Sequence, residues 1–194
     1  MYERCVEITQ AGTTRTVKIR VTPNNRAYRP DSAVFERTAL PVNPFIKVSR
    51  HADAIFGAGV SDALPDNLSF EYSRRTGRIK NFSLDGKLLA TLRTDGGLAL
   101  TIEGARHFVR NSQQFQQNCV VPVDEAVPFV SEGRSLFCRH VQWCGQKVLA
   151  GSDVAVLNGN DVIAVGVAVL SSALMGRYSR GVAVKVREGI KGRA

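Results

Sequence analysis

Residues 151–166 read Gly-Ser-Asp-Val-Ala-Val-Leu-Asn-Gly-Asn-Asp-Val-Ile-Ala-Val-Gly. Two apolar runs flank the polar triplet Asn158-Gly159-Asn160, which is typical of a tight turn between strands. We therefore predict strands at 153–157 and 162–170.

Further short strands are predicted on either side of this hairpin, at 136–143 and 181–187. Asp124 is placed to cap a helix that Gly133 would end in the left-handed conformation. A short helical turn is predicted over 171–175. Many short strands separated by glycine turns predict a small closed or pseudo-closed barrel.

The amino-terminal segment carries fewer signals. Apolar and charged residues alternate over 15–21, which predicts a strand, and the polar residues 22–25 predict a turn after it. Residues 26–50 are expected to be extended and irregular, because proline disfavours a helix at its own position and at the one before it. That segment holds Pro30, Pro41 and Pro44.

The middle of the chain predicts a small mixed domain. A short helix is expected within 49–64, weakened by Gly57 and Gly59. Asp85-Gly86 is a strong hairpin signal, and Thr101 is placed to cap a helix over 102–110. The polar, glutamine-rich stretch 113–118 is interpreted as a linker. Strands are predicted at 68–72, 79–84 and 88–93.

The composition is that of a globular protein, with 44% hydrophobic and 22% charged residues in a chain of 194. No apolar run approaches the ~18 residues of a membrane span, and no apolar signal core follows Met1. We expect a soluble cytoplasmic protein. Four cysteines without metal-ligand spacing are expected to be reduced and partly buried. They are Cys5, Cys119, Cys138 and Cys144.

The chain has a formal net charge of +9, which favours polyanionic partners. The excess lies at the two ends. Residues 1–50 hold nine basic and four acidic side chains, and residues 119–194 hold nine and six. Residues 51–118 are nearly balanced, with eight and seven. The basic charge alone identifies no ligand.

Three stretches in the last third resemble a PUA domain, and they occur in that family's order. The first, 124–137, looks like its first helix and turn, the second is the hairpin at 151–166, and the third, 180–187, looks like its closing strand. The resemblance covers 119–194. It implies an RNA-binding β-pseudobarrel.

The preceding residues resemble the domain before PUA in archaeosine tRNA-guanine transglycosylase. The similarity rests on Phe56-Gly-Ala-Gly59, on 72–79, on 85–93 and on Leu100-Thr-Ile-Glu-Gly-Ala105. The resemblance and the patterns together predict an α+β fold, with a small α/β pre-PUA domain followed by the PUA pseudobarrel. The expected division is a basic amino-terminal extension at 1–50, a transglycosylase C2-like domain at 51–118, and a PUA domain at 119–194.

This chain differs from that enzyme in two ways that bear on its expected function. Its chemistry resides on a (β/α)₈ barrel, which needs ~200 residues or more and has no room beside two other domains. The Pro-Cys-x-x-Lys-Pro-Tyr motif of the related archaeosine synthase is also missing. By family analogy, some archaea divide the enzyme between chains. We therefore expect a non-catalytic archaeal protein without metal or cofactor. It would bind RNA, by resemblance tRNA and its acceptor end, for a separate catalytic transglycosylase-like subunit, with no membrane partner.

The resemblance places the RNA contacts on the first helix, the glycine turn, the next strand and the last strand. Gly133 would let backbone approach a phosphate, or would only end the helix, and Arg134 and Ser135 would donate to phosphate oxygens. Phe137 would stack on a base, although a place in the core is the preferred interpretation. Arg139 is expected on the same strand side as Phe137.

The last strand supplies the other candidates. Arg180 and Gly181 precede it, and Lys185 and Arg187 share one predicted face, opposite a face of valines. These cations would contact phosphates, or would only form a solvated face. The basic cluster within 74–80 is either a further backbone contact or an exposed hairpin.

No catalytic arrangement surrounds the three histidines, His51, His107 and His140, which are expected to be satisfied or exposed. Two alternatives to an accessory RNA-binding protein stay open. One is an RNA-modification enzyme with an unrecognised site within 1–118. The other is an adaptor protein in ribosome assembly or translation.

Overall fold

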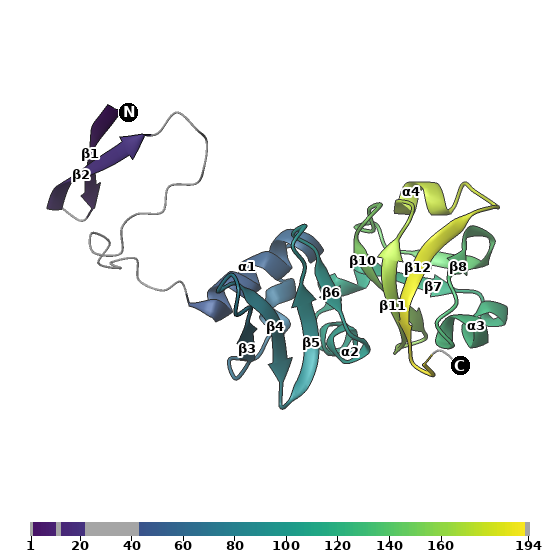
Figure 1. The fold of residues 1–194 in the computed structure, drawn as a ribbon. Coiled ribbons are helices and arrows are strands. Elements are labelled where there is room, and N and C mark those ends of the chain that lie inside the picture. Colours follow the sequence, from purple (N-terminus) through teal and green to yellow (C-terminus); the bar gives the residue numbers. More distant parts are fainter. Residues whose placement is uncertain (1, 11–12, 22–42, 193–194) are drawn as a thin grey trace. The chain divides into compact units, whose positions relative to one another are not determined.

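The computed structural model describes residues 2–10, 13–21 and 43–192, and the chain divides into two compact units, 1–41 and 42–194. The first unit contains an antiparallel hairpin of β1 (Tyr2–Gln10) and β2 (Thr13–Val21) (Figure 1). The strand predicted at 15–21 is confirmed within β2. The predicted turn at 22–25 and the prolines at 30 and 41 lie outside the described residues.

The second unit begins with helix α1 (Pro44–Phe56), so the prediction of irregular chain is wrong for residues 44–50. The Asn43 side chain accepts a hydrogen bond from the Phe45 amide at 2.9 Å and caps the helix. Pro44 stands at the first helical position, where its fixed φ suits the helix and no N–H is needed. The helix ends at Gly57, with φ 110°, and a 3₁₀ turn follows at Val60–Ala63.

A four-stranded antiparallel sheet follows α1, in the order β3-β4-β5-β6. Asp85 and Gly86 join β4 to β5 with positive φ values of 50° and 78°, as the hairpin signal predicts. The Thr101 hydroxyl accepts from the Gly104 amide at 3.1 Å and caps helix α2 (Ile102–Asn111), which is confirmed. The strands are β3 (Ser69–Tyr72), β4 (Ile79–Leu84), β5 (Lys87–Leu92) and β6 (Leu98–Leu100).

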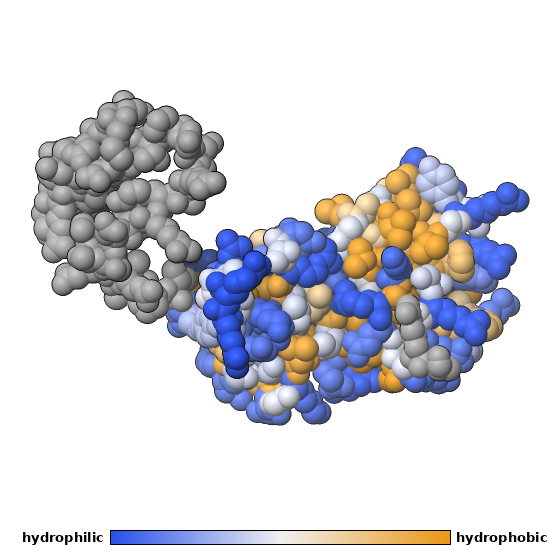
Figure 2. All heavy atoms as spheres, in the orientation of Figure 1, coloured by the Kyte–Doolittle hydropathy of each residue, from blue (hydrophilic) through white to orange (hydrophobic). Residues whose placement is uncertain are grey.

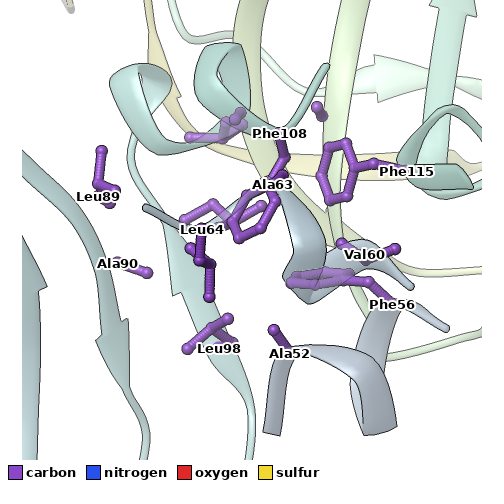
Figure 3. Packing of buried hydrophobic residues seen from close by; sticks show 14 of the residues in the cluster. Ala52, Phe56, Val60, Ala63, Leu64, Leu89, Ala90, Leu98, Phe108 and Phe115 are labelled. Atoms are coloured by element: carbon purple, nitrogen blue, oxygen red, sulfur yellow. The ribbon is translucent and has the colours of Figure 1, made fainter. Parts of the chain in front are cut away.

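Three phenylalanines form the centre of the first core (Figure 3). Phe56 lies 5.9 Å from Phe108 and 5.1 Å from Phe115, measured between ring centroids. Phe115 is fully buried in a 3₁₀ helix, Gln113–Asn118, and the Asn118 side chain donates to the Phe56 carbonyl at 2.8 Å. The linker predicted at 113–118 is therefore wrong, because one aromatic among the glutamines anchors the segment.

A six-stranded sheet follows, in the order β8-β12-β11-β10-β7-β9. It curls around a second core and forms the near-barrel of the predicted pseudobarrel, so the α+β fold class is confirmed. β7 pairs in parallel with β10, while the other pairs are antiparallel. The strands are β7 (Cys119–Pro122), β8 (Leu136–Phe137), β9 (Val141–Cys144), β10 (Asp153–Asn158), β11 (Asp161–Ala168) and β12 (Val182–Gly189).

Two predicted elements of this sheet differ in detail. The strand expected at 136–143 is divided into β8 and β9 by a 3₁₀ turn, Cys138–His140. The first helix is a 3₁₀ turn, Asp124–Ala126, continued by α3 (Val127–Ser131), and Asp124 does not cap it. The short helical turn predicted at 171–175 is confirmed as α4 (Ser172–Met175).

The six-stranded sheet also contributes to the first core. Buried side chains of β10 and β11 join the cluster that contains Phe108 and Phe115, among them Leu157 and Val162. Residues from both predicted domains therefore pack as one body between 43 and 192. None of the helices in the described residues is long and apolar enough to cross a membrane.

Candidate nucleic-acid interface

The glycine turn after α3 is built by backbone hydrogen bonds. Gly133 has φ 87°, its amide donates to the Val130 carbonyl at 2.9 Å, and the Arg134 amide donates to the Phe129 carbonyl at 3.0 Å. Gly133 is buried, and a Cβ built at Gly189 would lie 2.5 Å from the Gly133 nitrogen. Gly133 therefore ends the helix and permits close packing, and it does not present its own amide to a ligand.

A depression of about 340 Å³ opens beside this turn. The 3₁₀ turn at 138–140 forms one wall, and α3 with its glycine turn forms the other. A wider depression of about 680 Å³ adjoins it and shares Glu125, Arg139 and His140. The smaller depression is lined by Glu125, Ala126, Phe129, Val130, Arg134, Ser135, Leu136, Phe137, Arg139 and His140.

Two aromatic rings at this depression are open to solvent. Phe129 is 51% exposed and Phe137 is 48% exposed, so the preferred interpretation of Phe137 as a core residue is wrong. β8 is only two residues long at the sheet edge, and its Leu136 points inward while Phe137 points outward. Exposed rings beside cations suit stacking on unpaired bases.

The cations around the depression are held by neighbouring groups. The Arg134 guanidinium lies 5.3 Å from the centre of the Phe129 ring and 3.6 Å from the Glu132 carboxylate. Arg139 Nε donates to His140 Nε2 at 2.9 Å. Arg139 lies on the 3₁₀ turn, so the expected alternation with Phe137 along one strand is wrong, although both line the same depression.

The walls are of mixed charge. Asp124 and Glu125 line the wider depression together with Arg139 and His140. The surface is therefore not uniformly cationic. Arginines, two exposed aromatic rings and carboxylates line the two adjoining depressions, a set of groups that can accept a phosphate and the donor edge of a base.

The loop before β12 lies beside this surface. The Gly181 carbonyl accepts from the Cys138 amide at 3.0 Å, and Val182 pairs with Phe137. The exposed Arg180 directly precedes this bonded residue. Lys185 is also exposed, one strand position beyond the Val184–Leu136 pair.

Arg187 is engaged elsewhere. Its Nη1 donates to the Asp153 carboxylate at 2.7 Å and its Nη2 to the Leu100 carbonyl at 2.6 Å. Arg93 donates to the other oxygen of Asp153 at 3.2 Å. Only 3% of the Asp153 side chain is exposed, and burial raises its pKa while Arg187 and then Arg93 oppose that rise. The sequence pattern places Arg187 with Lys185, but the structure uses it to join the two sheets.

Lys191 lies next to the site, although the sequence did not indicate Lys191 as a site residue. Its amide donates to the Ser131 carbonyl at 2.9 Å, which brings this exposed cation beside the Gly133 turn. The only sequence signal is a lysine soon after the last predicted strand. The contact depends on the close approach of Gly189 to the turn.

The remaining candidates lie apart from the depression. The basic cluster at 74–80 is an exposed hairpin, in which the Gly77 amide donates to the Ser73 carbonyl and Lys80 lies 3.6 Å from Glu71. His107 is satisfied by the Ala63 carbonyl at 2.7 Å, as expected.

His51 differs from expectation. Its Nε2 is buried and has no hydrogen-bond partner within 43–192. Cys119, Cys138 and Cys144 are free thiols, with Cys119 and Cys138 buried as expected. Across the described ranges, no group of three or more histidine, cysteine or acidic side chains is arranged to hold a metal ion.

Family models match both parts of the second unit. The patch-forming domain C2 of tRNA-guanine transglycosylase matches residues 47–114, and the PUA domain matches residues 120–190. The chain is a PUA-domain protein. This PUA-domain protein has the C2 domain directly before the PUA domain, as the resemblance predicts.

Curated relatives of this PUA-domain protein are archaeal enzymes. A tRNA-guanine(15) transglycosylase of Methanobrevibacter smithii is 36% identical over 149 residues, which is 75% of this chain and 22% of the relative. The enzyme of Pyrococcus furiosus is 34% identical over 151 residues, which is 77% of this chain and 25% of the relative. The chain thus spans about a quarter of the length of these relatives.

Solved structures share the fold of this PUA-domain protein. A hypothetical protein of Pyrococcus horikoshii superposes with a TM-score of 0.59 at 16% identity, covering 75% of this chain and 89% of that one. A conserved PUA-domain protein of Thermoplasma acidophilum gives 0.54 at 17% identity, with the same two coverages. The two likenesses extend over both sheets of the second unit.

Proposed function

We propose that this PUA-domain protein binds tRNA without catalysing its modification, as an accessory subunit of a transglycosylase-type tRNA-modifying enzyme in the cytoplasm. The observation that carries the proposal is the depression beside the Gly133 turn, where two exposed rings lie among arginines of a PUA domain. The preceding C2 domain points to tRNA, because the same pair of domains occurs in tRNA-guanine(15) transglycosylases.

The binding mechanism divides between two kinds of contact. Arg134, Arg139 and Arg180 meet phosphates and position the RNA, with Arg forming paired hydrogen bonds. Phe137 and Phe129 stack on unpaired bases, a contact that single-stranded ends allow and duplex does not. We therefore assign the depression to an accessible end of tRNA, the acceptor end being the expected one.

The accessory role is supported by the part of the enzyme that the chain matches. The relatives extend well beyond the C2 and PUA domains, and this chain matches about a quarter of each. A binding portion on one chain would act by holding tRNA for a catalytic portion on another. Two sites on one complex raise the effective concentration of tRNA at the second.

The test is equilibrium binding of tRNA as a function of salt. Phe137→Ala should weaken binding by about 5- to 150-fold, the equivalent of ~1–3 kcal/mol of stacking. Arg134→Ala with Arg139→Ala should reduce the slope of log affinity against log salt by about 1.4 units. Lys47→Ala, an exposed cation of α1, is the matched control and should change neither by much.

Two results would refute the proposal. One is that the Phe137→Ala variant binds tRNA with the same affinity as the wild-type chain. The other is modification of tRNA by the purified chain alone in a single-turnover assay, which would make it an enzyme.

Removal of the unpaired 3′ nucleotides from tRNA should weaken binding to the level of Phe137→Ala.

A further inference from the structure

An exposed apolar surface covers the end of the six-stranded sheet that carries α4. We define the apical patch as Leu149, Val169, Leu174 and Tyr178. Their exposed fractions are 63%, 46%, 37% and 53%. Figure 2 shows hydrophobic residues gathered over α4 and the adjoining strand ends. A concentration of exposed apolar side chains on a folded protein marks an interaction surface more often than scattered ones do.

Backbone hydrogen bonds hold the segments of the patch together. The Ser172 amide donates to the Val148 carbonyl at 2.9 Å, and the Gly151 amide donates to the Ala168 carbonyl at 2.8 Å. These bonds place the loop of Leu149 beside the residues that follow β11 and begin α4. The Tyr178 amide donates to the Leu174 carbonyl at 3.2 Å. The four members of the patch therefore belong to one surface.

The patch is anchored from below. Met175 is 1% exposed, and its sulfur lies 3.6 Å from the thiol of Cys144 on β9. The Ser172 hydroxyl donates to the Gln146 carbonyl at 3.3 Å. A surface that is already ordered loses little conformational entropy when a partner binds, which favours affinity.

The rim of the patch is cationic. The two segments that build it, 142–152 and 168–181, contain no aspartate or glutamate, and the second contains Arg177 and Arg180. Arg177 and Arg180 are exposed, and neither lies within salt-bridge distance of a carboxylate in the described part of the chain. A partner that covers the apolar centre would gain from a carboxylate opposite Arg177.

The chemistry favours a protein over RNA and over a second copy of this chain. RNA interfaces are polar, and the leucine and valine side chains of the patch offer a nucleotide no hydrogen bond. In a symmetric dimer the same patch would face itself, and the arginines of both copies would repel each other. A different protein with an apolar surface and an acidic rim would complement both the apolar centre and the cationic rim of the apical patch.

We propose that the apical patch docks the separate catalytic transglycosylase-type subunit, through an apolar surface on that subunit bordered by carboxylates. This rests on the accessory role proposed above. Arg180 lies between the patch and the RNA depression, because Gly181 bonds to Cys138 and Tyr178 belongs to the patch. The two surfaces adjoin, so a docked catalytic subunit would stand next to the bound tRNA end.

The experiment measures complex formation between the full chain and the transglycosylase-type catalytic protein of the same organism, by sedimentation velocity and calorimetry. Val169→Asp and Leu174→Asp should each weaken the complex by at least about tenfold. The control is Ile190→Asp, which places the same charge on a side chain that is 44% exposed and outside the patch. Arg177→Glu should weaken the complex, and Arg177→Lys should largely preserve it.

The same variants are tested for tRNA binding without the partner and for thermal unfolding. Patch variants should bind tRNA within about twofold of the unmodified chain, as changes at separate sites do. Leu174→Gln, a milder change, replaces Leu174→Asp if the latter lowers the unfolding temperature.

Three outcomes overturn the proposal. The patch variants could bind the partner as the unmodified chain does, or could lose tRNA affinity on their own, which would make the patch an RNA surface. A chain that is dimeric and becomes monomeric with Val169→Asp would place a second copy there. Failure of the wild-type chain to bind any transglycosylase-type protein would instead refute the accessory role. The tRNA-binding experiments would then test RNA binding independently of that role.

Discussion

Replacement of Arg187 by methionine removes one of the polar contacts that join the two sheets. Arg187 donates to the Asp153 carboxylate at 2.7 Å and to the Leu100 carbonyl at 2.6 Å. The Asp153 side chain is 3% exposed and would keep Arg93 as its remaining cation, at 3.2 Å. Methionine retains much of the aliphatic packing, so the change tests the hydrogen bonds and the charge.

The expected loss of stability follows from these contacts. Removing one partner of a buried ion pair costs about 3–5 kcal/mol when the other charge is left uncompensated. Arg93 still compensates Asp153 in part, and the Arg187 side chain is 36% exposed, so water reaches the vacated position. We expect the free energy of unfolding to fall by about 2–3 kcal/mol. The unfolding temperature should fall by roughly 4–12 °C.

The loss should depend on pH in a specific direction. Burial raises the pKa of Asp153, and Arg187 is the strongest influence opposing that rise. Without Arg187 the pKa of Asp153 rises further above its unfolded value. An acid with a raised folded pKa destabilises the fold above that pKa, and the cost is relieved as pH falls through it and the carboxyl becomes neutral. The deficit of Arg187→Met should therefore shrink on acidification.

The assay is urea unfolding followed by circular dichroism at pH 7.5 and at progressively lower pH. Lys185→Met is the control, an exposed cation on the same strand that should change stability by no more than about 0.5 kcal/mol. A deficit of Arg187→Met below about 0.5 kcal/mol, or one that is the same at every pH, would contradict the role given to Asp153.

Two further predictions concern packing and thiol chemistry. Gly104→Ala should lower the free energy of unfolding by about 1–3 kcal/mol or more, because its Cβ would lie 1.9 Å from the Leu89 carbonyl oxygen. Gly176→Ala is the control, because its Cβ meets open space, and it should be close to neutral in the same urea titration. Equal effects of the two substitutions would contradict this account. Burial raises the pKa of Cys119 to about 12 and of Cys144 to about 11. At pH 8 a thiol reagent should therefore modify Cys144 about a hundredfold, and Cys119 about a thousandfold, more slowly in the native chain than in urea. Native Cys144 reacting at the unfolded rate would refute that expectation.

Local signals predicted much of the fold. The Asn158-Gly159-Asn160 turn, the Asp85-Gly86 turn and the Thr101 cap depend on neighbours a few residues away, and all three are present. The helix at Pro44 does not follow from the rule that proline disfavours helices, because that rule does not hold at the first helical position, where Pro44 stands after Asn43.

The errors come from contacts between distant segments. Residues 113–118 are polar in sequence, but Phe115 reaches a core built by Phe56 and Phe108. Strand alternation put Arg187 with Lys185 on one face, and nothing in the local pattern shows that Asp153 and Leu100 lie beside Arg187.

The sequence predicts only the part of the candidate site that is built from residues close together in the chain. Arg134, Phe137 and Arg139 do line one depression, because all three follow the same helix closely in the chain. Their expected geometry was wrong, since the 3₁₀ turn at 138–140 replaces a continuous strand. Lys191 could not be assigned, because its place depends on the packing of Gly189 against the Gly133 turn.

The central claim is that nucleotides bind beside the Gly133 turn. Ultraviolet crosslinking of the full chain to bound tRNA, followed by mass spectrometry of the crosslinked peptides, tests it most directly. We expect the crosslinks to fall within 134–139, with Phe137 as the principal site, and to disappear in Phe137→Ala. Crosslinks confined to the hairpin at 74–80, with none beside the depression, would contradict the claim.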